Sequence, residues 1–126
     1  MNSVKWLLGL VMVLMLPVSA MAGSATLTWT GNGEGDLAGY KMFRGNGVCA
    51  VGPLQPLIVN GSAVSLGKVT TYTDTTVPTF DGDLCYEITA FDTANNESTR
   101  SVRATKAVNL VPPVPPVGLT IVTVTP

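Results

Sequence analysis

The sequence predicts an all-β domain folded as a β-sandwich, on the strength of three observations. Residues 84–91 alternate between two faces, with Tyr86 and Ile88 on one of them, which is the period-2 pattern of a half-buried strand. Short segments of this kind are separated by glycine, proline, asparagine and aspartate over about a hundred residues. Outside the N-terminal leader, no apolar stripe at helical spacing lasts more than two turns. We therefore expect no helix in the folded domain.

The leader, residues 1–22, has the features of a cleaved secretory signal. Lys5 supplies a positive start, residues 6–16 are almost entirely apolar, and small residues precede the expected cut after Ala22. A membrane anchor is the less favoured alternative, because the apolar run falls well short of the ~20 residues needed to span a bilayer. We expect a secreted, periplasmic or cell-surface protein whose folded domain spans residues 23–108.

Charge and composition exclude several classes of function. After the leader, six basic side chains stand against eight acidic ones, a net charge near −2 with no run of either sign. Nucleic acids and anionic membranes require a concentrated basic face, so neither is an expected partner. The chain has no histidine, which excludes Ser-His-Asp and Cys-His nucleophiles and ordinary zinc catalysis. We predict a protein that is not an enzyme and uses no cofactor or metal.

Two cysteines, Cys49 and Cys85, occur in a chain addressed to an oxidising compartment. Neither belongs to a CxxC motif or to a cluster with metal-ligand spacing, so a disulfide between them is the default expectation. Two free thiols are the alternative.

The first two strands are separated by a glycine-rich break. In residues 25–30 threonines alternate with apolar residues, so Leu27 and Trp29 are expected to point inward. Three glycines and an asparagine in residues 31–36 favour a tight connection. The alternation resumes in residues 37–44, the second strand.

The middle of the chain is more irregular. Prolines confine any pairing of residues 48–56 to an edge. Residues 57–59 form a possible short edge strand before Asn60 and Gly61, a strong hairpin signal. A further strand is expected over residues 65–74.

The last part of the domain is predicted to be a hairpin. A loop over residues 78–83 leads into the strand at 84–91, and a polar turn over residues 92–97 follows it. Residues 99–108 alternate weakly and are expected to form the last strand.

Taken together, these segments resemble a fibronectin type III domain of the kind found in bacterial secreted and surface proteins. The likeness covers residues 25–108, and its motifs are, in order, Leu27-Thr28-Trp29, residues 37–45, Thr71-Tyr72-Thr73-Asp74, residues 85–92 and Asn96-Glu97-Ser98. It implies a seven-stranded immunoglobulin-like β-sandwich. Strands C and F are neighbours in that fold, so Cys49, just beyond strand C, could reach Cys85. The resemblance also implies a non-catalytic binding or structural module whose partner is a protein or a surface polymer.

Two features depart from the family pattern. Leu84 stands where the family usually has a tyrosine at the start of strand F, so that corner must be held in another way, and the disulfide is one candidate. Strand A is missing from its usual place before residue 25, whereas the tail, residues 109–126, contains a proline-rich segment followed by Gly118-Leu119-Thr120 and a β-rich run. Three outcomes stay open. The tail completes its own domain, completes the next copy as a donated strand in a self-assembling subunit, or trails as a disordered linker.

Acidic side chains raise two further possibilities. Asp92, Asn95, Asn96 and Glu97 carry oxygens at a spacing that could hold calcium, although they lack an EF-hand pattern and turn formation accounts for them as well. The carboxylate pairs of a small hydrolase or of a carbohydrate-binding accessory are a remote alternative, because each pair flanks a glycine in a turn. These pairs are Asp81 with Asp83 and Glu34 with Asp36.

Phe43 and Phe91 occupy the outward phase of their strands. If those strands are neighbours, the two rings lie near each other on the outer face of one sheet. They then form a binding patch or are covered by the loop that carries Cys49.

Overall fold

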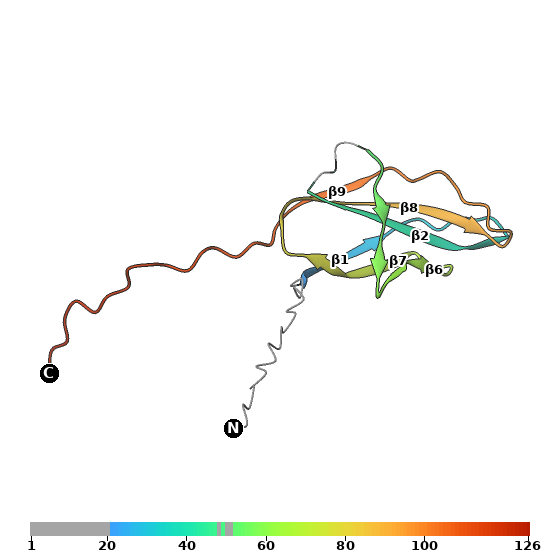
Figure 1. Ribbon diagram of the computed structural model, residues 1–126. Coiled ribbons are helices and arrows are strands. Elements are labelled where there is room, and N and C mark those ends of the chain that lie inside the picture. The colour runs from blue at the N-terminus through green and yellow to red at the C-terminus, as the bar shows by residue number, and fades with distance from the viewer. Residues whose placement is uncertain (1–20, 48, 50–51) are drawn as a thin grey trace, which may run out of the picture.

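The computed structural model describes residues 21–47, 49 and 52–126, and every regular element in this part of the chain is a β-strand, as predicted. Within it, no helix is long and apolar enough to cross a membrane. The predicted leader lies outside the described residues except for its last two, which begin the first strand. The strands (Figure 1) are β1 (Met21–Thr28), β2 (Leu37–Asn46), β3 (Gln55–Pro56), β4 (Ile58–Val59), β5 (Ser62–Ala63), β6 (Ser65–Leu66), β7 (Thr71–Pro78), β8 (Asp81–Asp92) and β9 (Ala104–Asn109).

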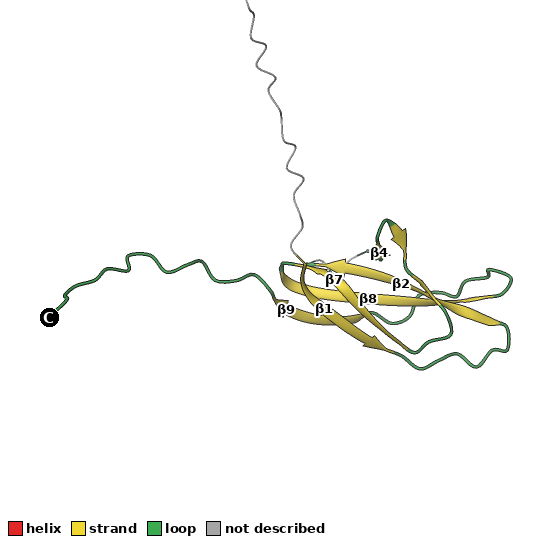
Figure 2. Ribbon diagram, turned by 90° about the horizontal axis from the view of Figure 1, so that it is seen from below, coloured by secondary structure: helices red, strands yellow, loops and turns green. Residues whose placement is uncertain are grey.

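The strands form two layers that lie face to face (Figures 1 and 2), which is consistent with a β-sandwich. One layer contains β1 and β7, paired antiparallel, and the other has the order β3-β2-β8-β9, with β6 also paired to β2. The short strands β4 and β5 form a separate hairpin. Its turn residues, Asn60 and Gly61, have φ angles of 50° and 80°. Positive φ at both positions is what a type I′ turn requires, so the predicted hairpin is confirmed.

The core lies between the two layers. Leu27 of β1 and Trp29, the residue that follows this strand, are partly buried and pack against the core, whereas Thr26 and Thr28 are exposed, which confirms the predicted inward face. The residues at the centre of the core are Met42, Leu57, Val77, Leu84 and Tyr86.

The single strand predicted over residues 65–74 is wrong, because the chain forms β6 and β7 in different layers. β6 lies so close to β2 that a Cβ atom at Gly39 would be 1.8 Å from the carbonyl oxygen of Leu66. Only glycine permits this approach. After β6 the chain leaves the layer that contains β2 and reaches the layer of β1 and β7 through residues 67–70, so the pairing cannot be continuous.

The predicted loop over residues 78–83 is also too long. β7 continues to Pro78 and β8 begins at Asp81, because Gly82, with φ at 137°, stays paired with Val108. A glycine that breaks the apolar alternation therefore lies inside a strand.

The last strand begins at Ala104 and not at residue 99. Before it, two serines continue the contact with β8 through their side chains. The N–H groups of Ala90 and Ile88 donate to the Oγ atoms of Ser98 and Ser101, at 2.9 and 3.0 Å. The serine N–H groups donate in return to the carbonyls of Ala90 and Ile88. In this stretch, the N–H groups of β8 donate to serine hydroxyls, whereas in a regular strand pair they would donate to backbone carbonyls.

The tail leaves the domain after β9. Leu110 is still partly buried, but residues 112–126 are exposed, form no strand and make no hydrogen bond to the described strands. Figures 1 and 2 show this segment leading away from both layers. The outcome in which the tail completes its own domain is therefore not what the structure has. Among the described residues, β1 pairs with β7 alone.

Candidate functional site: the open edge of β1

The edge of β1 that no described strand pairs with presents backbone hydrogen-bonding groups. Trp29 donates its N–H to the carbonyl of Thr70 at 3.0 Å, so the backbone groups of Trp29 face the β7 side. Successive residues of a strand point their N–H and C=O groups to opposite sides. The register is uninterrupted from Ala25 to Thr28, so the N–H and C=O groups of Thr26 and Thr28 face the open edge. Groups of this kind form a template for another extended chain.

An apolar groove runs beside this edge, between β1 and the strands of the other layer. It consists of two hollows of about 230 and 280 Å³. The first is lined by Leu27, Trp29, Met42 and Ile88, among others, and the second continues along β1 to β9. The groove therefore gives access to the side of the core that no described strand covers.

Trp29 lies at one end of the groove. Its ring packs edge-on against Tyr40, with ring centroids 5.3 Å apart. Its indole Nε1 is buried and has no hydrogen-bond partner among the described residues. A buried donor without an acceptor is uncommon in folded proteins. This end of the groove therefore contains an N–H group that lacks a hydrogen-bond acceptor among the described residues.

A buried carboxylate links the two layers of the sandwich. Asp74 of β7 is fully buried and pairs with Arg44 of β2 at 2.8 Å. It also accepts hydrogen bonds from the Tyr86 hydroxyl at 2.7 Å and from the Thr76 N–H and hydroxyl. Burial alone would raise the pKa of Asp74, but these hydrogen bonds outweigh it and hold that pKa below its ordinary value. Burial and the Asp74 carboxylate together raise the pKa of Tyr86.

On the outer face, the structure has Phe43 covered and not open. The Phe43 side chain is 7% exposed and packs with Cys49, Leu54 and Cys85. We call Cys49 and residues 52–54 the covering segment. The predicted disulfide between Cys49 and Cys85 is present in the structure and holds this segment to β8. Of the two alternatives for Phe43, the covered one holds.

Phe43 and Phe91 also do not meet. Their strands are neighbours, but Phe43 pairs with Glu87 and Phe91 pairs with Gly39. Four residues of strand separate the two positions, a distance of roughly 13 Å at the rise of a β-strand. The prediction that the two strands are neighbours is confirmed. The prediction of a patch shared by the two rings is wrong, because the register keeps them apart.

Two arginines brace the covering segment, a role that no sequence pattern indicated. Arg100 stacks on the Phe43 ring, with its guanidinium carbon 3.8 Å from the centroid, and donates to the Leu54 carbonyl at 2.6 Å. Arg103 donates to the carbonyls of Cys49 and of Gly52. Both guanidinium groups also contact Glu87, at 3.3 and 3.4 Å.

Replacing Arg103 by glutamine should loosen this segment, because two backbone carbonyls lose a charged donor. We expect the R103Q variant to lose about 1 kcal/mol of stability and to be cleaved several-fold faster between residues 49 and 54 in limited proteolysis followed by mass spectrometry. K106Q is the matched control, since Lys106 lies on exposed β9 and makes no ion pair with the described residues. Equal cleavage of both variants would contradict the bracing role.

The polar turn after β8 is occupied by internal contacts. The Asp92 carboxylate accepts hydrogen bonds from the N–H groups of Ala94 and Asn96 and from the Asn96 amide, and Asn95 has a φ angle of 63°. Glu97 pairs with Lys41 at 2.8 Å and accepts the Thr89 hydroxyl. The Asn96 contact lowers the pKa of Asp92, and the Lys41 contact lowers that of Glu97. The Asp92 oxygens are therefore engaged within the turn, and the Glu97 oxygens are engaged by side chains of β2 and β8.

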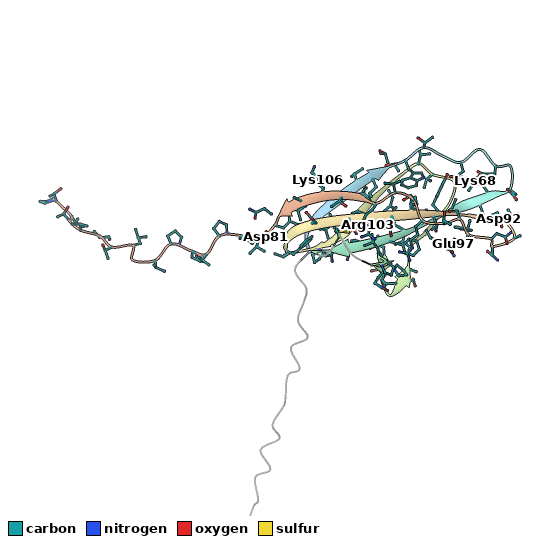
Figure 3. All side chains as sticks on the ribbon, turned by 90° about the horizontal axis from the view of Figure 1, so that it is seen from above. Lys68, Asp81, Asp92, Glu97, Arg103 and Lys106 are labelled. Carbon is teal, nitrogen blue, oxygen red and sulfur yellow. A yellow bond between two sulfur atoms is a disulfide. The ribbon has the colours of Figure 1, made fainter. Side chains whose placement is uncertain are left out.

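The four carboxylates of the hydrolase alternative are exposed, which gives a catalytic pair no support. Asp81 accepts the N–H groups of Leu110 and Val111 at 2.8 and 2.9 Å, so it fixes the exit of the tail. Figure 3 places Asp81 at the end where the tail leaves and Asp92 and Glu97 at the opposite end. No group of three acidic, cysteine or histidine side chains suited to a metal ion occurs in the part of the chain that the structure describes.

Comparisons of this chain with protein-family models, with curated proteins and with solved structures found no match.

Proposed function

We propose that this chain is a non-catalytic binding module of the fibronectin type III kind, secreted or periplasmic, that takes an extended segment of a partner protein along the open edge of β1. The observation that carries the proposal is an unpaired edge directly beside an apolar groove. The backbone groups of Thr26 and Thr28 would bind the main chain of the partner, while the groove would take alternate side chains, which is the logic of β-strand addition. The disulfide is compatible with an oxidising compartment.

The order and pairing of the strands also support the proposal, because they agree with those of a fibronectin type III domain. β1, β2, β7, β8 and β9 occur in the order and the pairing expected of strands B, C, E, F and G. Strand A would lie on the free edge of β1. The binding edge is then the place that a missing strand leaves open.

The test uses the isotope-labelled chain from Gly23 to Pro126 and a hexapeptide of alternating valine and threonine as a generic strand. We expect the peptide to slow hydrogen exchange at the Thr26 and Thr28 amides and to leave the Ile58 and Ala63 amides unchanged. The fluorescence of Trp29 should change in parallel, because it is the one tryptophan after residue 22. Edge amides that are already protected in the isolated monomer, or that never respond to the peptide, would overturn the proposal.

A further inference from the structure

We infer that the segment bound along β1 is residues 118–125 of a second copy of this chain, running antiparallel to β1. This inference rests on the proposed function and adds the partner and its direction. It makes the protein a subunit that assembles head to tail.

The tail has the chemistry of the missing strand. Residues 119–124 are rich in β-branched side chains and carry no charge. Their apolar side chains are almost fully exposed, with Ile121, Val122 and Val124 at 83%, 88% and 84%. Exposed apolar residues in such a row mark an interaction site.

The alternation of the tail matches the groove in one phase. With Val122 and Val124 turned inward, Thr120 is also inward, and Ile121 points outward together with Thr123 and Thr125. Thr26 and Thr28 are likewise exposed on the outer face of β1. The bound strand would therefore continue both the apolar interior and the threonine-rich surface of this layer.

The exit point of the tail decides between the chain's own groove and that of another copy. Leu110 lies beside the start of β1, since a methyl group at Gly23 would be 3.9 Å from its Cδ2 atom. Asp81 holds the next N–H group there as well. Every pairing between the described strands is antiparallel, so we take the same direction for the bound strand. A strand antiparallel to β1 must enter the groove at the opposite end, beside Trp29. The tail therefore leaves its own domain at the end where such a strand would finish.

The linker makes return to the chain's own groove unfavourable. The groove beside residues 23–29 is roughly 20 Å long at about 3.3 Å per residue. Residues 111–118 span about 25 Å as polyproline II at ~3.1 Å per residue. They could cover that length only after reversing direction at Pro112-Pro113, where φ is fixed. In the structure the linker leads away from the folded domain (Figure 1). This direction would carry the tail toward the groove of a second copy.

The first experiment compares the chain from Gly23 to Pro126 with two proline variants of its tail. V122P removes an N–H group and interrupts the donated strand, whereas V114P is the matched control in the proline-rich linker. Neither position contacts the folded domain, so both variants should fold. Light scattering after size exclusion should show a mass that rises with concentration for the parent chain and V114P, and a monomer for V122P.

A second measurement tests the site and the direction. A peptide of residues 117–126 should bind the V122P chain, slow exchange at the Thr26 and Thr28 amides and change Trp29 fluorescence. With a spin label on T125C of the peptide, the amides of residues 23–25 should broaden more than those near Trp29.

Four results would overturn the inference. Oligomers that persist in V122P would place the contact elsewhere. A monomeric parent whose edge amides are protected only while Val122 is intact would mean that the tail binds its own domain. A monomeric parent with an open edge that binds the valine–threonine peptide but not its own tail would remove the second copy as partner and leave the proposed function standing. If neither peptide binds, both proposals fail.

Discussion

Replacing Cys49 and Cys85 together with alanine is expected to lower the free energy of unfolding by about 3–4 kcal/mol. The disulfide closes a loop with a sequence separation of 36, and the chain-entropy model assigns a loop of this size roughly that stabilisation, because the unfolded chain gains freedom when the link is removed. For a domain of this size, that is a large part of a total of about 5–15 kcal/mol.

Urea denaturation of the oxidised and the reduced parent chain, alongside the double alanine variant, measures this effect. Reduction changes the link without changing side-chain volume, so the reduced parent should lose most of the 3–4 kcal/mol by itself. The dependence of the free energy on urea concentration should also become steeper, because the unlinked chain exposes more surface when it unfolds. A loss below about 1 kcal/mol would contradict the chain-entropy estimate for this link.

The strands that alternate strongly could be predicted from local sequence. Residues 25–30 and 84–91 each have one face of apolar residues, and the structure puts those faces toward the core. The Asn60-Gly61 turn was equally clear, because few other dipeptides accept positive φ twice. Such features depend on neighbouring residues only.

Features that depend on distant residues could not be predicted. The break between β6 and β7 follows from the approach of Leu66 to Gly39, which no local pattern records. The same applies to Arg100 and Arg103, whose partners lie some fifty residues earlier in the chain. For Phe43 and Phe91, the sequence correctly indicated neighbouring strands but not the register between them.

The candidate site at the edge of β1 was predictable in part. The resemblance alone predicted an open edge, because it placed no strand A before residue 25 and found a β-rich segment in the tail. The groove could not be predicted, because it depends on how the two layers diverge beside β1. The exit of the tail beside Gly23 was also unforeseen, and it is this contact that favours a second copy over the chain's own groove.

Replacing Asp74 by alanine is expected to destabilise the domain by about 3–5 kcal/mol, because Arg44 would remain largely buried without its partner. The hydroxyl of Tyr86 would lose its acceptor at the same time. D83A is the matched control, since Asp83 is exposed on β8, and its stability should stay within about 0.5 kcal/mol of the parent. Urea denaturation at neutral pH measures both changes. A loss for D74A as small as that for D83A would contradict a structural role for the buried pair.

The same carboxylate predicts how stability depends on pH. The pKa of Asp74 is lower in the folded protein than its ordinary value of 3.8, so the folded state favours the ionised form and gains stability from it above that value. This stability is lost as the pH falls below 3.8 and through the lowered pKa of the folded state, where Asp74 takes up a proton. In D74N the loss should be smaller in this range and should come from Asp92 and Glu97, whose pKa values are also lowered. Acid titrations of stability that coincide for D74N and the parent, apart from a constant offset, would show that Asp74 does not control the acid limit of this fold.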